Sequence, residues 1–269
     1  AELGGDSRAT EAMLRRYRAH CDDQMVQGTI KAATVSNRVR GLRRLVDWLW
    51  QQRHIDELPR GLPEICAKYS QEKQAVALTD QEVKRLWTHA DPRMRTLIAL
   101  SLNCGFYFSE IAQLRGKDLQ DGYAARRRPK TGVPSKHKLW KLTEQLVERT
   151  RDNRSDEDLL YQTRNGYPLI HDNGVRCDSL YTPWRELCKR AKVKATSSQL
   201  RDTAATFIEG VGVRTGNPKL VSQFLAHADA RTARWYIDQR LDPHSLETDA
   251  LDAAIKEAET HYAKVLKRA

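Results

Sequence analysis

The first 50 residues carry a helical pattern of apolar positions. From Thr10 to about Trp50 the chain reads as helices, and spacings of three and four place a single apolar stripe at Val35, Val39, Leu42, Val46 and Leu49. We expect this stripe to form a core. Arg40, Arg43 and Arg44 fall largely on the opposite face, where they are either solvated or positioned to contact a DNA backbone.

A break in this pattern divides the chain. Pro59, Gly61 and Pro63 interrupt the helical periodicity, and the polar segment from Ala67 to Ala77 resembles an extended connector. We therefore expect a helical domain over residues 1–66, a linker over 67–77 and a second domain over 78–269.

The second domain begins with clear helix signals. Thr79 followed by Glu82 is a capping-box pattern and predicts a helix start. A further helix runs from Met94 to the Cys104-Gly105 pair, and Ser109-Glu110 opens a short one that reaches Leu114.

The character of the sequence changes between Asp118 and Leu142. This stretch alternates and is rich in glycine and proline, which predicts a small antiparallel sheet with one basic hairpin. Helices are expected from there to the end, where the amphipathic stretch 249–266 could cap its own domain or dock onto a neighbouring molecule. The fold class predicted is mainly α with a small antiparallel β-sheet.

The net charge of the chain indicates the kind of partner that it binds. Lys and Arg total 46 against 35 Asp and Glu, a net charge of +11. Between Lys117 and Lys141 lie eight basic and two acidic residues, a local balance of 8 − 2 = +6. Such density favours a polyanion, so we expect this hairpin to lie along a phosphate backbone through Arg126, Arg127, Arg128 and Lys136.

The cysteine content and the hydrophobicity of the chain also indicate its cellular compartment and whether it needs a cofactor. The five cysteines are odd in number and contain no Cys-x-x-Cys pair, which argues against a disulfide framework and against a zinc site. The sequence has no apolar run long enough to cross a bilayer, and its start has no signal-peptide pattern. We expect a soluble, cytoplasmic, nucleoid-associated protein without a metal or other cofactor.

Three residues near the end combine the groups needed to break a phosphodiester. Arg201, His227 and Tyr236 follow one another in the segments Leu-Arg-Asp-Thr, Leu-Ala-His and Trp-Tyr. A tyrosine hydroxyl can attack phosphorus, an arginine can neutralise the transition state, and an imidazole can hold the phosphate or manage a proton. Each residue alone has an ordinary structural reading, and the order and spacing of the three together favour chemistry.

This pattern resembles the tyrosine recombinases, or phage integrase family, over nearly the whole chain. The resemblance implies that Tyr236 is the nucleophile, Arg201 the second arginine and His227 the histidine of the Leu-Gly-His box. Lys130, in Pro-Lys-Thr-Gly, matches a lysine that protonates the leaving 5′ oxygen. The implied function is site-specific recombination or integration through a 3′-phosphotyrosyl intermediate, as on a mobile element.

Two positions depart from the family pattern. Its first box reads Gly-Leu-Arg-x-Ser-Glu, and this chain has Gly-Phe-Tyr-Phe-Ser-Glu, so Tyr107 stands in place of the first catalytic arginine. Ser198 stands where histidine is usual. Tyr107 and Ser198 are kept as candidate catalytic residues: Tyr107 could offer a neutral hydroxyl, or it could only pack between Phe106 and Phe108. Alternatively, Arg115 or one of residues 126–128 could supply the lost guanidinium. The alternative to a recombinase is an impaired, recombinase-like DNA-binding protein with a regulatory or architectural role.

The resemblance also implies an architecture and partners. Residues 1–66 would be the core-binding, DNA-binding domain and residues 78–269 the catalytic domain, together closing on double-stranded DNA. The family acts as a homo-oligomer, a tetramer on paired sites, which makes 249–266 a candidate contact between subunits and leaves a place for an accessory DNA-bending protein.

Overall fold

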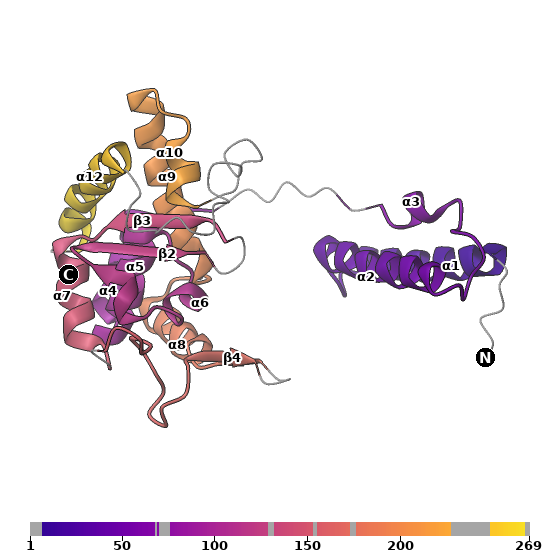
Figure 1. Cartoon of the computed structure of the whole chain (residues 1–269), viewed down its shortest axis with the longest axis horizontal. Helices are drawn as coiled ribbons and strands as arrows, with labels where there is room; N and C mark the ends of the chain where they lie inside the picture. Colours follow the sequence, from indigo (N-terminus) through magenta and orange to yellow (C-terminus); the bar gives the residue numbers. More distant parts are fainter. Residues whose placement is uncertain are drawn as a thin grey trace. The chain divides into compact units, whose positions relative to one another are not determined.

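The structure, a computed structural model, describes residues 7–67, 69, 76–128, 132–152, 155–172, 176–226 and 248–266. The chain divides into two compact units, residues 1–74 and residues 75–269. Each unit is described by itself below, with the element labels of Figure 1.

The first unit is a small helical domain. It contains α1 (Ser7–Val26), α2 (Ala32–Gln51) and the short α3 (Leu62–Ile65). The predicted apolar stripe of α2 is confirmed, since Val35, Val39 and Val46 are buried and Leu42 and Leu49 pack beside them. Spacings of three and four place these side chains on one face of the helix, where they meet α1.

The second unit begins with three helices that follow the predicted start signals. They are α4 (Asp80–His89), α5 (Pro92–Cys104) and α6 (Phe108–Ile111). The capping box of Thr79 and Glu82 forms at the start of α4. Helix α6 is shorter than predicted and begins one residue earlier, because Tyr107 occupies its N-cap.

Gly105 sets the geometry between α5 and α6. Its φ of +64° is in the left-handed region that favours glycine, and this ends α5. A Cβ at this position would lie 2.7 Å from the Phe224 ring. The close approach brings the end of α10 against the turn that leads into α6.

The predicted basic hairpin is confirmed. A three-stranded antiparallel sheet has the order β1 (Leu119–Gln120), β2 (Tyr123–Arg127) and β3 (Pro134–Lys138). A short 3₁₀ helix, η1 (Gly116–Asp118), leads into it. The expectation that helices alone follow this sheet was wrong, because β4 (Ile170–Asp172) and β5 (Arg176–Asp178) form a second antiparallel pair. These strands have three residues each, too few to show a period-two pattern in the sequence.

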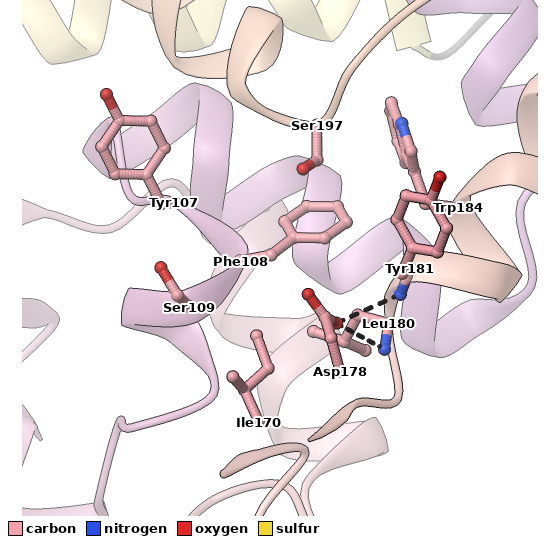
Figure 2. A pocket seen from close by; sticks show the side chains of 9 residues that line it. All are labelled: Tyr107, Phe108, Ser109, Ile170, Asp178, Leu180, Tyr181, Trp184 and Ser197. Carbon is pink, nitrogen blue, oxygen red and sulfur yellow. Dashed lines mark hydrogen bonds between the residues drawn. The ribbon is translucent and has the colours of Figure 1, made fainter. Parts of the chain in front are cut away.

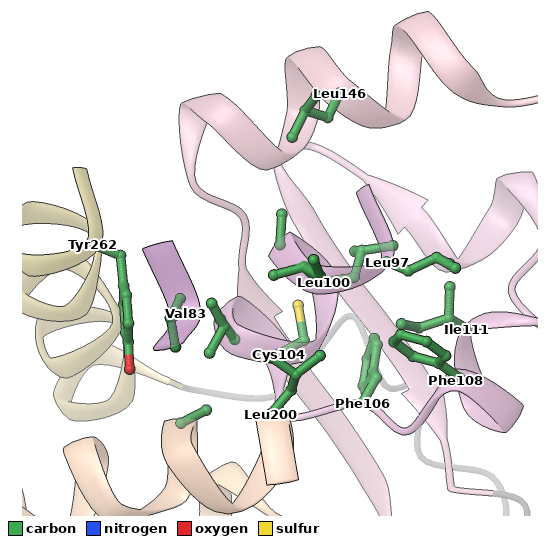
Figure 3. Packing of buried hydrophobic residues seen from close by; sticks show 14 of the residues in the cluster. Val83, Leu97, Leu100, Cys104, Phe106, Phe108, Ile111, Leu146, Leu200 and Tyr262 are labelled. Carbon is green, nitrogen blue, oxygen red and sulfur yellow. The ribbon is translucent and has the colours of Figure 1, made fainter. Parts of the chain in front are cut away.

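Further helices complete the described part of the second unit. They are α7 (Lys141–Thr150), α8 (Tyr181–Ala191), α9 (Ser198–Thr215), α10 (Leu220–Phe224) and α12 (Asp249–Leu266). Helix α5 is buried from Leu97 to Cys104, and α7 and α9 pack against it. Figure 3 shows this core, where residues of α5 meet Phe106, Phe108 and Ile111. The mainly helical fold class is confirmed.

The last helix caps its own unit. Tyr262 stacks on Trp140 with ring centroids 5.5 Å apart, and the Trp140 indole donates to the Ile255 carbonyl over 3.1 Å. Tyr123 of β2 donates to the Asp252 carboxylate over 2.6 Å, and this bond raises the pKa of Tyr123 to about 12. In this structure α12 therefore packs within the chain.

Candidate active site

The predicted site residues differ in what the structure describes of them. Lys130, His227 and Tyr236 lie outside the described residues. In the first unit, Arg40, Arg43 and Arg44 are exposed on α2, opposite the buried stripe. The other predicted residues lie in the second unit, around the start of α9 and the basic hairpin.

Arg201 is the most enclosed of these residues. It lies in the first turn of α9 and retains 4% of its accessible surface. Its Nη1 donates to the Gly105 carbonyl, and its Nη2 donates to the Leu225 carbonyl over 2.8 Å. The guanidinium thus joins the end of α5 to the residue two positions before His227.

Glu110 balances the charge of Arg201 and of a second arginine. Its Oε2 lies 3.5 Å from Nη1 of Arg201, and its Oε1 lies 3.2 Å from Nε of Arg128. Nη1 of Arg128 also reaches the Leu225 carbonyl at 3.4 Å. Burial, together with the positive charge of Arg128, lowers the pKa of Arg201. Two guanidinium groups therefore meet at one carboxylate and one carbonyl.

The hairpin arginines do not share one environment. Arg126 is buried, with 8% of its surface exposed, and donates to the main-chain carbonyl of Glu110. Burial lowers its pKa. Arg127 is half-buried and donates to the Gly132 carbonyl over 3.2 Å. We expected all three arginines along a backbone-binding surface. Arg126 of β2 is instead turned inward to Glu110, and Arg128, the residue after β2, also contacts Glu110.

Tyr107 lies directly against this cluster. The Arg201 guanidinium carbon is 4.6 Å from the centre of the Tyr107 ring, a cation–π contact. The Tyr107 amide donates to Glu110 Oε2 over 2.9 Å. Tyr107 is half-buried, whereas its neighbours Phe106 and Phe108 are core residues. The Tyr107 ring therefore covers the guanidinium of Arg201.

Tyr107 lines a pocket beside the cluster, and Ser198 directly follows the lining residue Ser197. Ser198 is the first residue of α9, is half-buried, and its Oγ lies 2.9 Å from Thr196 Oγ1. The adjoining pocket measures about 150 Å³ and is lined by Tyr107, Ser197 and residues of α6, α8 and the β4–β5 hairpin. Figure 2 shows the Phe108 ring between Tyr107 on one side and Tyr181 and Trp184 of α8 on the other, with the Tyr107 ring extending away from Ser109.

A buried histidine, His137, lies beside the arginine cluster. His137 of β3 is 1% exposed, lies edge-on to the Phe106 and Phe224 rings, and donates from Nε2 to the Phe224 carbonyl over 2.9 Å. Burial lowers its pKa to about 4. The cavity between His137 and the arginines is about 10 Å³, no larger than a water molecule. The interior of this cluster therefore has no room for an anion larger than a water molecule.

Sequence reasoning did not select Glu110 or His137 as site residues. Glu110 stands in the first box beside Ser109, so the box itself contained the signal. His137 had no comparable signal, because a lone histidine in a strand is more often structural. The pairing of Arg128 with Glu110 depends on the tertiary contact between β2 and α6.

Two searches of the described residues gave negative results. Among them, no cluster of three or more His, Cys, Asp or Glu side chains is arranged to hold a metal ion. Within the same part of the chain, no helix has the length and hydrophobicity needed to cross a membrane.

Known proteins share this fold. A lambda integrase dimer bound to a COC′ core site superposes with a TM-score of 0.61 and 18% identity, covering 89% of this chain and 82% of that chain. The Tn1549 transposon integrase in complex with circular intermediate DNA superposes with a TM-score of 0.54 and 17% identity, covering 82% of this chain and 79% of that chain. A lambda integrase bound to DNA superposes with a TM-score of 0.58 and 14% identity, covering 85% of this chain and 84% of that chain.

The sequence itself assigns the family. No curated protein matches the chain at a significant level. The profile of the phage integrase family, however, matches residues 77–241, more than half of the chain. This range includes Tyr107, Glu110, Arg128 and Arg201, the residues that meet in the second unit. The chain belongs to the phage integrase family, the tyrosine recombinases.

Proposed function

We propose that this protein is a site-specific DNA recombinase that cuts and rejoins strands through Tyr236. The Tyr236 oxygen attacks the scissile phosphorus and loses its proton, while the bond to the 5′ oxygen breaks and Lys130 protonates the leaving oxygen. A 5′ hydroxyl from a second strand then attacks the 3′-phosphotyrosyl link and returns the tyrosine hydroxyl. The phosphodiester count is unchanged, so the reaction requires no nucleotide.

The observation that carries this proposal is the position of Arg201. Its bonds to the carbonyls of Gly105 and Leu225 bring the second arginine to the Leu-Ala-His box, at which His227 follows. An arginine has five N–H donors. Among the described residues, Gly105, Leu225 and Glu110 engage its two Nη atoms, which leaves the Nε edge to bind a phosphate oxygen.

Surface charge supports duplex DNA as the substrate. Arg40, Arg43 and Arg44 are exposed on one face of α2, and Arg127 and Lys136 lie on the hairpin. Cations on a surface gain affinity for DNA by releasing counterions. The neighbouring structures of lambda and Tn1549 integrases are complexes with DNA, one of them a dimer. We propose that residues 1–66 bind DNA and that the active form is a tetramer on paired sites.

A covalent adduct tests this function. Duplexes that bind the protein are selected from a random pool, and the selected site is nicked near each candidate phosphate so that the released 5′ fragment diffuses away. A protein–DNA adduct on a denaturing gel is expected with the natural chain. It should disappear in Tyr236→Phe, which loses the nucleophile and keeps the ring.

The second candidate function is DNA binding without cleavage. The observation that favours it is Tyr107, whose neutral ring occupies the position of the first arginine and covers Arg201. Removing one transition-state donor costs about 10²- to 10³-fold in rate. Tight binding of the selected site without any adduct would establish this candidate and refute the recombinase.

A further inference from the structure

Position 107 leaves the site short of one positive charge. Tyr107 caps α6 with its amide on Glu110, and its ring covers the guanidinium of Arg201. A phenol cannot neutralise a phosphate oxygen as a guanidinium does. If the proposed function holds, another residue must supply the missing charge, and four nearby arginines are candidates.

Contacts exclude three of these candidates. Arg115 is exposed, and its guanidinium donates to the Glu157 carbonyl. Arg127 donates to the Gly132 carbonyl within the hairpin. Arg126 is buried beneath the main chain of Glu110, facing the Phe106 ring at 5.9 Å. Among the described residues, the hydrogen-bond partners of Arg115 and Arg126 are not those of Arg201, and the bond of Arg127 to Gly132 lies within the hairpin.

Arg128 shares both partners of Arg201. Its Nε lies 3.2 Å from Glu110 Oε1, while Arg201 lies 3.5 Å from the other carboxylate oxygen. Both arginines also donate to the Leu225 carbonyl, at 3.4 Å and 2.8 Å. The Arg128 side chain is 11% exposed, so these contacts hold it in place. The two guanidinium groups are thus adjacent, at the turn that leads to His227.

Two guanidinium groups share the single carboxylate of Glu110, since Arg128 and Arg201 each lie within 3.5 Å of one of its oxygens. Asp202 and Asp118 are the other acidic side chains whose charge acts here, on Arg201 and on Arg126 respectively. Like charges brought together in a partly buried site cost free energy unless an anion joins them. A phosphodiester carries one negative charge, and its two non-bridging oxygens match a pair of guanidinium groups.

We infer that Arg128 is a catalytic phosphate-binding residue of this site and replaces the charge that a first-box arginine would supply. The inference rests on the proposed function. In the attack by Tyr236, negative charge grows on the non-bridging oxygens, and Arg128 and Arg201 stabilise it from two sides. The substitution at position 107 and the arginine at position 128 then form one altered clamp.

Adduct formation on the selected, nicked duplex tests the role of Arg128. Arg128→Met keeps the length of the side chain and removes its charge, so we expect the adduct rate to fall by about 10²-fold or more. Arg93→Met is the matched control, because Arg93 also donates to a carboxylate and a carbonyl, those of Asp152 and Gln162, away from the site. Its rate should stay within about threefold of the natural chain.

Two further measurements separate catalysis from structure. Thermal melting should show Arg128→Met to be as stable as the natural chain, because Glu110 keeps Arg201 as its partner. Adding Tyr107→Arg to Arg128→Met should restore the adduct rate by about tenfold or more, because it returns a guanidinium to the clamp.

The outcomes that overturn the inference are distinct from failure of the proposed function. A rate for Arg128→Met within about threefold of the natural chain overturns it, as does a lower rate that merely follows lost thermal stability. If the natural chain binds the selected site and forms no adduct, the proposed function itself fails, and the inference fails with it.

Discussion

Removing the charge of Glu110 should destabilise the second unit strongly. The carboxylate accepts from the Tyr107 amide and lies 3.5 Å from Arg201 and 3.2 Å from Arg128. With an effective dielectric constant of about 20, each ion pair at these separations is worth about 5 kcal/mol before desolvation. The Glu110 side chain is 11% exposed, so solvent screens these pairs weakly.

Glu110→Gln keeps the shape and one acceptor oxygen, and leaves two adjacent guanidinium groups without a counter-charge. Breaking a buried pair in this way costs about 3–5 kcal/mol, a large part of the stability of a typical domain, about 5–15 kcal/mol. Urea unfolding at low salt measures the loss. We expect Arg128→Met to recover a good part of it in the double variant, because it removes one of the two repelling charges.

The matched control is Glu157→Gln. Glu157 pairs with Lys117 at 2.7 Å, yet its side chain is 74% exposed, so the free energy of unfolding should hardly change. A loss below about 1 kcal/mol for Glu110→Gln would refute the reasoning, because it would mean that water already screens the cluster.

Three other predictions follow from the same structure. Gly105→Ala should cost about 2–4 kcal/mol in urea unfolding, because a Cβ would lie 2.7 Å from the Phe224 ring at a φ of +64°. Gly132→Ala, at a φ of +70° with nothing within 4 Å, gives the backbone cost alone, so equal losses would contradict this account. The pKa of His137 is lowered from 6.5 to about 4, so the unfolded state binds the proton first. Stability should therefore be unaffected above pH 6.5 and fall by about 3 kcal/mol between pH 6.5 and 4, and urea midpoints across this range should show a smaller fall in His137→Gln. For DNA binding, Arg127→Ala and Lys136→Ala should each reduce the slope of log affinity against log salt by about 1. An unchanged slope would remove the hairpin from the interface.

The sequence predicted best what depends on local pattern. The stripe of α2, the capping box at Thr79 and the basic hairpin each involve residues within a few turns of one another, and each was confirmed. The β4–β5 pair was missed because three-residue strands have no readable period. Arg201 was selected through its motif, but its partners Gly105 and Leu225 come from other elements. Contacts of this kind are fixed by packing, which no spacing in the chain reveals.

The same limit explains why Arg128 could not be distinguished from its neighbours in the sequence. Arg126, Arg127 and Arg128 are consecutive and chemically identical, and two of them, Arg126 in β2 and Arg128 just after it, contact Glu110. Only the position of α6 then separates these two, since Arg126 meets the Glu110 main chain and Arg128 its carboxylate. Sequence reasoning reached this group of candidates, and tertiary structure is needed to choose among them.

Glu110 and Arg128, two charged residues beside Arg201, should differ in how their removal changes the stability of the fold. Losing Glu110 leaves positive charges facing each other, so the folded state should suffer even without DNA. Losing Arg128 leaves one arginine paired with one carboxylate, and an apolar replacement of a buried ion is often neutral for stability or favourable. A residue whose removal leaves the fold stable and impairs the reaction acts by binding the substrate. We therefore expect the charge of Arg128 to serve the reaction, and the charge of Glu110 to stabilise the fold by offsetting the repulsion between Arg128 and Arg201.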